Sequence, residues 1–346
     1  QVYLAPQPPR LRSPQSCVQT LRWIHSILQE TRAELVHSTM AYSALFGALT
    51  CWRLQLPHLW FQHGPVSGWM DILAEILPNQ LILANSQHTE KAQHQVGGRL
   101  KPWLKSLFGL RRPVQVIYPG LDLPHFPDAE VAARERIQKR AEWNVGPDEF
   151  VVGLIGRPQP QKGLQLFVEA LQEAAQRSAT KKISGMIVGG AKDRETQGAY
   201  EQAVRKEVNR RQAPIRWLPA SSRVLEIISG LDSVVCASIS PEGWGLTLLE
   251  AMGLRKPVIG PNEGGPLEMI QENETGMIYP ARNASELAQS IQRLAEDPTL
   301  CEKLGQQAYW SVHRRFQFQG TMDQLEQIYF TLLAGRIRST QTDQSK

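Results

Sequence analysis

Short, mainly apolar runs alternate along the chain with longer segments in which apolar residues recur at helical spacing. The first group of runs predicts strands at 34–37, 59–62, 80–84 and 114–118. The second group predicts strands at 150–155, 183–188, 215–218, 233–237, 257–259 and 276–279. The helical segments lie at 17–32, 41–54, 67–76, 87–96, 162–177, 197–211, 222–230, 245–254 and 284–296. Strands that alternate with helices predict parallel sheets covered on both faces.

Two successive series of this kind predict two Rossmann-like α/β domains, which we place at 1–135 and 136–312 because a helical stretch, 130–142, carries the chain across. Ligands bind such sheets beyond the carboxyl ends of the strands, so a cleft between the domains is the expected site. The last periodic segment predicts a helix broken near Gly320, and the polar residues 336–346 predict a disordered tail.

The composition fits two globular domains, since 42% of the 346 residues are hydrophobic and 21% are charged. We find neither an apolar run of membrane-spanning length nor a secretory leader. The scattered cysteines predict no disulfide framework, so the cytosol is the simplest compartment. The four cysteines lack metal-binding spacing, and we expect no metal site. The net charge of +5 suits an anionic partner. Nucleic acid is not expected, because the basic residues are dispersed and no recognition motif is present.

Two carboxylates flank a predicted turn-to-helix junction. Glu242 precedes the helix and Glu250 lies about two turns inside it, while Gly243 and Gly245 let the backbone approach a ligand closely. The first amides of a helix lack intrahelical partners and favour an anion. A sugar nucleotide suits such a pocket, since it carries hydroxyls at both ends and a diphosphate between them. The alternative is a surface turn followed by a solvated helical glutamate.

A basic loop follows the strand at 150–155. Arg157 and Lys162 lie just after this strand, at the carboxyl edge of the predicted sheet, and Gly156 opens the loop. Two cations can neutralise a diphosphate there, the arginine as a planar fork and the lysine as a point charge. The alternative is an ordinary solvated basic loop.

Together these motifs resemble those of the retaining family-4 glycosyltransferases, which belong to the glycosyl transferases group 1 and have the GT-B architecture. The resemblance rests in the second domain on Gly156-Arg157-x4-Lys162-Gly163, Ala237-Ser238 leading into Glu242-Gly243-Trp244-Gly245, Glu250, Pro257-Val258-Ile259 and Gly264-Gly265-x-x-Glu268. Weaker similarities in the first domain are Leu35-Val36-His37, His63-Gly64, Ala84-Asn85-Ser86 and Tyr118-Pro119-Gly120-Leu121-Asp122.

The resemblance implies two Rossmann-like domains that face each other across a cleft, and a hexosyltransferase that uses a nucleotide-diphosphate sugar with no cofactor and no metal. Arg157 and Lys162 would grip the diphosphate, Glu242 would face the donor sugar, and Glu250 would hold the ribose. His63 would lie near the sugar, although a purely structural histidine is as compatible with the sequence. The remaining implied donor-binding residues are Gly156, Gly243, Gly245, Leu246 and Thr247.

The resemblance also implies features at the two ends of the chain. A family member begins with a strand, a Gly-Gly turn and a helix, which we do not find before Glu34, so we expect an incomplete first domain. A C-terminal helix, 313–335, would cross back to that domain. A catalytically silent module that binds a nucleotide or a partner protein remains an alternative, and so does a GT-B epimerase or phosphorylase. The acceptor, a saccharide or a lipid-linked group, stays open.

A short amphipathic segment precedes residue 113. Its apolar face consists of Trp103, Leu104, Leu107 and Phe108, and lysines and arginines flank it. Such a segment suits peripheral contact with an anionic membrane, and the alternative is a short helix that packs on its own domain.

Overall fold

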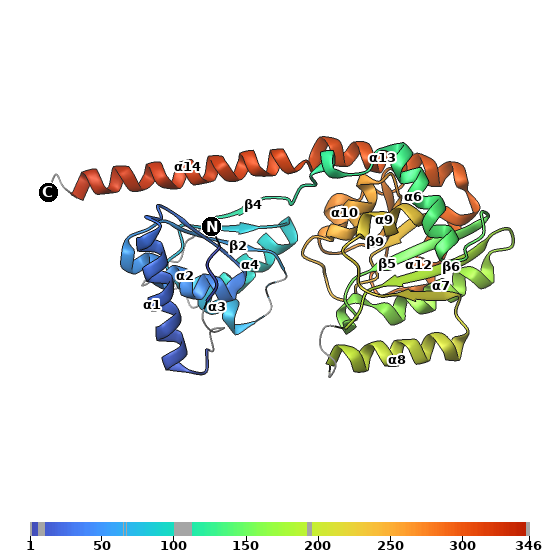
Figure 1. Cartoon of the computed structure of the whole chain (residues 1–346), viewed down its shortest axis with the longest axis horizontal. Helices are drawn as coiled ribbons and strands as arrows, with labels where there is room; N and C mark the ends of the chain where they lie inside the picture. Colours follow the sequence, from blue (N-terminus) through green and yellow to red (C-terminus); the bar gives the residue numbers. More distant parts are fainter. Residues whose placement is uncertain are drawn as a thin grey trace. The chain divides into compact units, whose positions relative to one another are not determined.

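The computed structural model describes residues 2–5, 11–64, 66, 68–99, 113–191 and 196–343 (Figure 1). The segment with Trp103, Leu104, Leu107 and Phe108 lies outside these residues, so its predicted membrane contact stays a prediction. Within the described ranges, none of the helices combines the length and the apolar character needed to cross a membrane.

The chain divides into two compact units. Unit 1 comprises Gln1–Tyr118 together with Thr321–Lys346, and unit 2 comprises Pro119–Gly320. The sequence predicted the first boundary later in the chain, after residue 135, and the second boundary earlier, after residue 312. The helix predicted at 130–142 lies within unit 2, where it packs against a neighbouring helix of that unit.

Unit 1 contains a parallel sheet of four strands in the order β1-β2-β3-β4. The strands are β1 (Val36–Thr39), β2 (His58–Gln62), β3 (Leu81–Ala84) and β4 (Val114–Val116). The helices are α1 (Pro14–Glu30), α2 (Met40–Leu54), α3 (Trp69–Ile76), α4 (Gln87–Arg99) and most of α14 (Phe318–Asp343).

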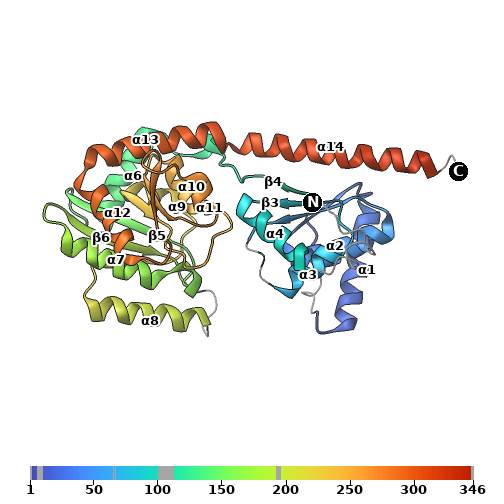
Figure 2. The ribbon, with the colours of Figure 1, turned by 180° about the vertical axis from the view of Figure 1, so that it is seen from behind.

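Both faces of β2 are buried. Successive side chains of a strand point to opposite faces, so each face of β2 packs into a different core. Trp60 packs into one core with Phe46 of α2, and Leu59 and Phe61 pack into another core with Ile328 of α14. Helix α14 therefore covers one face of the unit 1 sheet, although it lies far from β2 in the sequence (Figure 2).

Unit 2 contains a parallel sheet of six strands in the order β10-β9-β8-β5-β6-β7. The strands are β5 (Glu149–Ile155), β6 (Lys182–Val188), β7 (Ile215–Leu218), β8 (Ser233–Val235), β9 (Val258–Pro261) and β10 (Gly276–Tyr279). The helices are α6 (Ala129–Glu142), α7 (Leu164–Arg177), α8 (Thr196–Arg211), α9 (Val224–Gly230), α10 (Leu246–Gly253), α11 (Gly265–Met269), α12 (Ala284–Glu296) and α13 (Pro298–Arg315), with short 3-10 turns η1 (Leu123–His125) and η2 (Pro160–Lys162).

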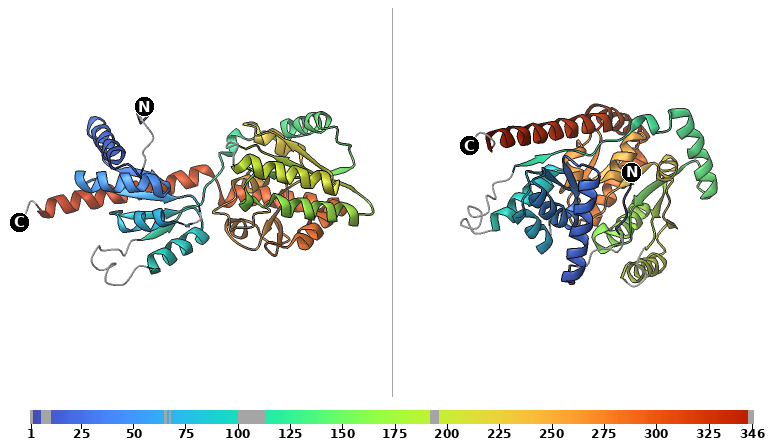
Figure 3. Two further views of the ribbon diagram at one scale, coloured as in Figure 1. Left: turned by 90° about the horizontal axis from the view of Figure 1, so that it is seen from below. Right: turned by 60° about the vertical axis from the view of Figure 1, so that its left-hand side comes forward.

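Helices lie on both faces of this sheet (Figure 3). Buried residues of α7 and α12, among them Phe167 and Ile291, form one core with alternate residues of β5. The strand order runs outward from β5 to β7 and then restarts at β8 on the other side of β5. This reversal is a topological switch point, where open parallel sheets bind their ligands. The α/β class with two Rossmann-like domains is thus confirmed.

The C-terminal helices differ from the prediction in where they break and where they end. The break lies at Phe316 and Gln317, not at Gly320, which is helical. The backbone of Leu121 accounts for it, because its N–H donates to Phe316 O at 2.8 Å and its carbonyl accepts from Phe318 N–H at 2.9 Å. Helix α14 also continues to Asp343, through 336–343 of the predicted disordered tail, and no proline there would end a helix.

Candidate active site

A cavity of about 330 Å³ lies in unit 2 at the carboxyl ends of β5 and β8. These two strands are neighbours, with Val152 paired to Ser233 and Gly153 to Val234. The cavity brings together most of the second-domain residues that the sequence singled out: Gly156, Arg157, Lys162, Glu242, Gly245, Leu246 and Thr247. It therefore occupies the switch point of the sheet.

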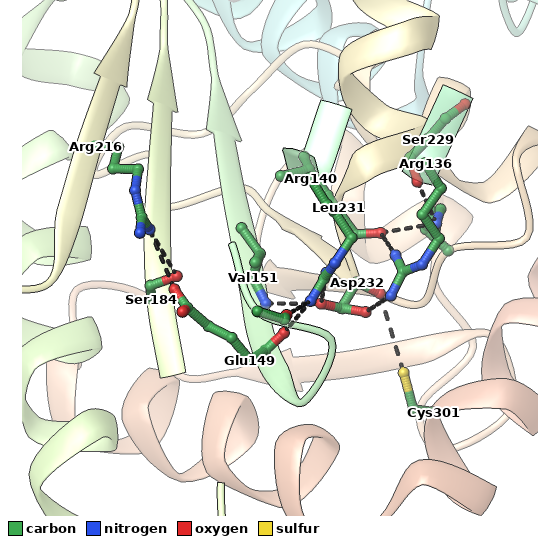
Figure 4. A network of polar contacts seen from close by, with 12 residues as sticks. Arg136, Arg140, Glu149, Val151, Ser184, Arg216, Ser229, Leu231, Asp232 and Cys301 are labelled. Carbon is green, nitrogen blue, oxygen red and sulfur yellow. Dashed lines mark hydrogen bonds and ion pairs between the residues drawn. The ribbon is translucent and has the colours of Figure 1, made fainter. Parts of the chain in front are cut away.

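At the opposite edge of the sheet, a network of buried and partly buried charges joins β5 and the segment before β8 (Figure 4). Asp232, which precedes β8, accepts hydrogen bonds from Arg136 at 2.5 Å, from Arg140 at 3.0 Å and from the Val151 amide at 2.7 Å. Arg140 also donates to the carbonyl of Glu149 at 2.5 Å. These hydrogen bonds join helix α6 to the amino ends of the two strands, at the edge of the sheet opposite the cavity.

Glu149 belongs to the same network. Burial raises the pKa of its carboxyl group, but hydrogen bonds from Lys182, Ser184 and Arg216 outweigh burial and bring the pKa to about 2. The carboxylate is therefore charged at neutral pH and paired on the amino side of the sheet, away from the cavity.

The loop after β5 is fixed against the end of β8. Gly163 has a left-handed φ of 62°, and a Cβ atom there would lie 1.8 Å from the carbonyl oxygen of Ala237. Only glycine fits both requirements. The Ile239 amide donates to Gln161 O at 2.9 Å, which joins the two segments again. Lys162, between Gln161 and Gly163, is consequently held at the cavity.

Lys162 and Glu242 form an ion pair inside this cavity. The Lys162 ammonium donates to Glu242 Oε1 at 2.6 Å, and the hydroxyl of Ser238, which is 2% exposed, donates to the same oxygen. The sequence motif contained Ser238 but assigned it no function. Only its position on the loop after β8, four residues before Glu242, hinted at this contact.

The start of α10 supplies backbone donors. Gly245 adopts a left-handed φ of 101° immediately before the helix, and the first-turn residues Leu246 and Thr247 line the cavity. The amides of the first helical turn have no partner within the helix and lie at the positive end of its dipole, so they favour an anion there. The backbone of Glu242 is supported from behind, because its carbonyl accepts from the Gly265 amide at 2.8 Å.

Glu250 and Gly243 are not among the residues that line the cavity. Glu250 lies on α10, and burial raises the pKa of its carboxyl group to about 7. Within the described part of the chain, no side chain donates to it and no cation pairs with it. Gly243 instead contributes its carbonyl to the close packing against Gly265.

Cys236 also lines the cavity, and the sequence did not predict it there. Burial, reinforced by the charge of Glu242, raises the pKa of its thiol to about 11. The thiol is therefore neutral at physiological pH and behaves as a small apolar group.

His63 lies in unit 1, directly after β2. Its ring packs on Phe61 with 4.1 Å between ring centroids, and burial lowers its pKa. His37 of β1 is nearby, and its Nδ1 is 2.6 Å from the hydroxyl of Tyr329 of α14. Burial, and then the charge of His63, lower the pKa of His37. The lowered pKa values favour the neutral form of both histidines at neutral pH.

Solved structures show the fold class to which these two units belong. The chain aligns with Anabaena Alr3699/HepE in complex with UDP-glucose at a TM-score of 0.78 and 22% identity, over 94% of this chain and 84% of that one. It aligns equally with a glycosyltransferase from Rickettsia africae, at a TM-score of 0.78 and 20% identity over the same shares. The fold is the GT-B arrangement of two Rossmann-like domains.

Residues 135–310 match the model of the family described as glycosyl transferases group 1. The chain belongs to this family. Curated relatives include the D-inositol 3-phosphate glycosyltransferases of Nocardia farcinica, 26% identical over 286 residues, and of Corynebacterium efficiens, 28% identical over 219 residues. These alignments cover 80% and 62% of this chain but only 61% and 50% of the relatives, so the chain spans little more than half of their length.

Proposed function

We propose that this protein transfers a sugar from a nucleotide-diphosphate sugar to an acceptor hydroxyl, as a retaining, metal-independent hexosyltransferase. The observation that carries the proposal is the cavity at the switch point of unit 2, which gathers two cations, a carboxylate and the first amides of α10. These groups are complementary to a diphosphate attached to a sugar.

The chemistry follows from the charges that develop as the sugar–phosphate bond breaks. The sugar gains oxocarbenium character, and the leaving diphosphate gains negative charge, which Arg157, Lys162 and the start of α10 neutralise without a metal. Glu242 faces the donor sugar, and Glu250 accepts the ribose hydroxyls.

Retention of configuration follows if a donor phosphate oxygen takes the proton of the acceptor hydroxyl on the same face of the sugar. No carboxylate base is then needed, so Glu242 and Glu250 are not an acid and nucleophile pair of the glycoside hydrolase type. His63 is the residue of the first domain that the proposal assigns to the donor sugar.

UDP is the first nucleotide to test, because the Anabaena structures that share this fold contain UDP or UDP-glucose. The acceptor in our proposal is a saccharide or a lipid-linked hydroxyl in the cytoplasm, with peripheral membrane contact through 103–108.

Calorimetric titration with UDP, GDP and ADP tests the donor site. We expect saturable binding of one nucleotide, lost in Lys162→Ala because the diphosphate loses its point charge, and lost in Glu250→Ala because the ribose loses its acceptor. Lys206→Ala is the matched control, since this exposed lysine lies on α8 outside the cavity. Failure of all three nucleotides, or equal loss of binding in the Lys206 variant, would contradict the proposal.

A further inference from the structure

In the structure Lys162 is paired with Glu242, so a diphosphate must compete with this carboxylate for the ammonium. Both Lys162 Nζ, at 2.6 Å, and Ser238 Oγ donate to the same oxygen, Glu242 Oε1. The lysine side chain is 33% exposed and the glutamate side chain 19%, so the pair is only partly screened by water. Arg157, by contrast, makes no ion pair with any residue of the described ranges.

The backbone on each side of this pair is fixed. A Cβ atom on Gly163 would collide with Ala237 O at 1.8 Å, which keeps the Lys162 loop against the end of β8. A Cβ atom on Gly264 would lie 2.6 Å from Glu242 O, so α11 packs directly behind Glu242. Side chains can rotate within this frame, whereas the two loops cannot separate without losing these contacts.

We propose that Lys162 and Glu242 form a latch that the distal phosphate of the donor opens, and that Ser238 is the positioning residue that keeps Glu242 in place once Lys162 has left. This inference rests on the proposed function. The diphosphate of the donor carries about two negative charges, against one for a carboxylate, and its distal phosphate offers two non-bridging acceptor oxygens, so it competes successfully for the ammonium. The sugar then supplies Glu242 with a hydroxyl donor in place of Lys162.

The latch links recognition of the two halves of the donor. A nucleoside diphosphate without its sugar breaks the ion pair and leaves Glu242 with Ser238 alone, whereas a nucleoside monophosphate leaves the pair closed. Removing the charge of Glu242 therefore affects diphosphate binding and not monophosphate binding. Simple repulsion between Glu242 and any phosphate would affect both.

The test is calorimetric titration of UDP and UMP, GDP and GMP, and ADP and AMP into the unaltered chain, Glu242→Gln, Ser238→Ala and the double variant. In Glu242→Gln we expect the diphosphate to bind about tenfold more tightly, as for a partly buried ion pair, and the monophosphate to be unchanged. In Ser238→Ala we expect the diphosphate to bind about threefold more weakly, because the hydrogen bond to Glu242 matters more once Lys162 has left, and part of its loss already affects the free protein. The double variant loses this Ser238 effect, since the charged carboxylate is gone.

Glu263→Gln is the matched control, because Glu263 pairs with Arg282 at 2.7 Å and does not line the cavity. Equal tightening of monophosphate and diphosphate in Glu242→Gln, or tightening in the Glu263 variant, would overturn the latch while leaving the donor site intact. Absence of binding by every nucleotide would overturn the proposed function and the latch together.

Discussion

The carboxyl group of Glu250 is partly buried on α10 without a charged partner in the described chain, and this burial raises its pKa to about 7. A hydroxyl that donates to a carboxylate stabilises the charged form, so a bound ribose would lower this pKa. Nucleotide affinity should therefore fall as the pH decreases through 7, by about tenfold per pH unit once the free protein is protonated and while the complex is not. The measurement is the dissociation constant between about pH 8 and pH 5.5.

The phosphate groups of the nucleotide titrate near pH 6 as well and add a pH dependence of their own. Glu250→Gln is the control that separates the two effects, because it keeps the size of the side chain and removes its titration. We expect the variant to show only the shallower dependence of the phosphates. Identical pH profiles for the two proteins would contradict a role for Glu250 in ribose binding.

Single residues of the site were predictable to different degrees. Arg157, Lys162 and Glu242 stand beside glycines and strand ends, and the resemblance to a glycosyltransferase family joined them in one predicted donor site. The shared hydrogen bonds of Glu242 with Lys162 and Ser238 could not be predicted. They depend on the adjacency of β5 and β8, which are distant in sequence and meet only because the sheet order reverses.

At the scale of elements, two glycines differ in whether their surroundings leave room for a side chain. Gly163 precedes α7 with a left-handed φ of 62° and no room for a Cβ atom, whereas Gly320 lies in the first turn of α14, where a Cβ atom would meet nothing within 4 Å beyond its chain neighbours and the helix's own backbone. We expect Gly163→Ala to lower the free energy of unfolding of unit 2 by at least about 2 kcal/mol through strain and collision with Ala237. Denaturant unfolding monitored by circular dichroism measures the change.

Gly320→Ala is the matched substitution, and we expect it to raise helix stability by about 0.5–1 kcal/mol, since alanine loses less backbone entropy than glycine in a helix. A stabilised Gly163 variant would show that the loop relaxes freely. A destabilised Gly320 variant would show that the chain needs a flexible joint at the position where the sequence predicted one.

Most strands and helices were predictable because their apolar residues follow a regular period. The exceptions depend on tertiary contacts. Helix α11 is five residues long and holds too few apolar positions to show a period. The end of α13 is set by the pairing of Leu121 with Phe316 and Phe318, and no feature of the sequence near Gly320 could reveal a partner so far upstream.

At the scale of the whole molecule, residues that are far apart in the sequence belong to one unit. Residues from Thr321 onward belong with Gln1–Tyr118, because α14 covers the sheet face formed by Leu59, Leu81 and Leu83. The resemblance predicted such a helix, but the residues that it buries follow only from the sheet order and the register of β2 with β3. Among the described residues, those that line the cavity belong to unit 2, so we expect nucleotide binding there to be independent of the stability of unit 1.

Ile328→Ala tests this separation. Ile328 is 8% exposed in the core of unit 1, and its truncation should lower the free energy of unfolding of that unit by about 2–5 kcal/mol. Hydrogen exchange followed by mass spectrometry should show faster exchange in β2 and β3, with the nucleotide dissociation constant unchanged. Leu171→Ala, in the unit 2 core, should instead speed exchange in β5 and β6. If Ile328→Ala weakened nucleotide binding as much as Lys162→Ala, the donor site would need an intact unit 1, and the cavity of unit 2 would not be sufficient to hold the nucleotide.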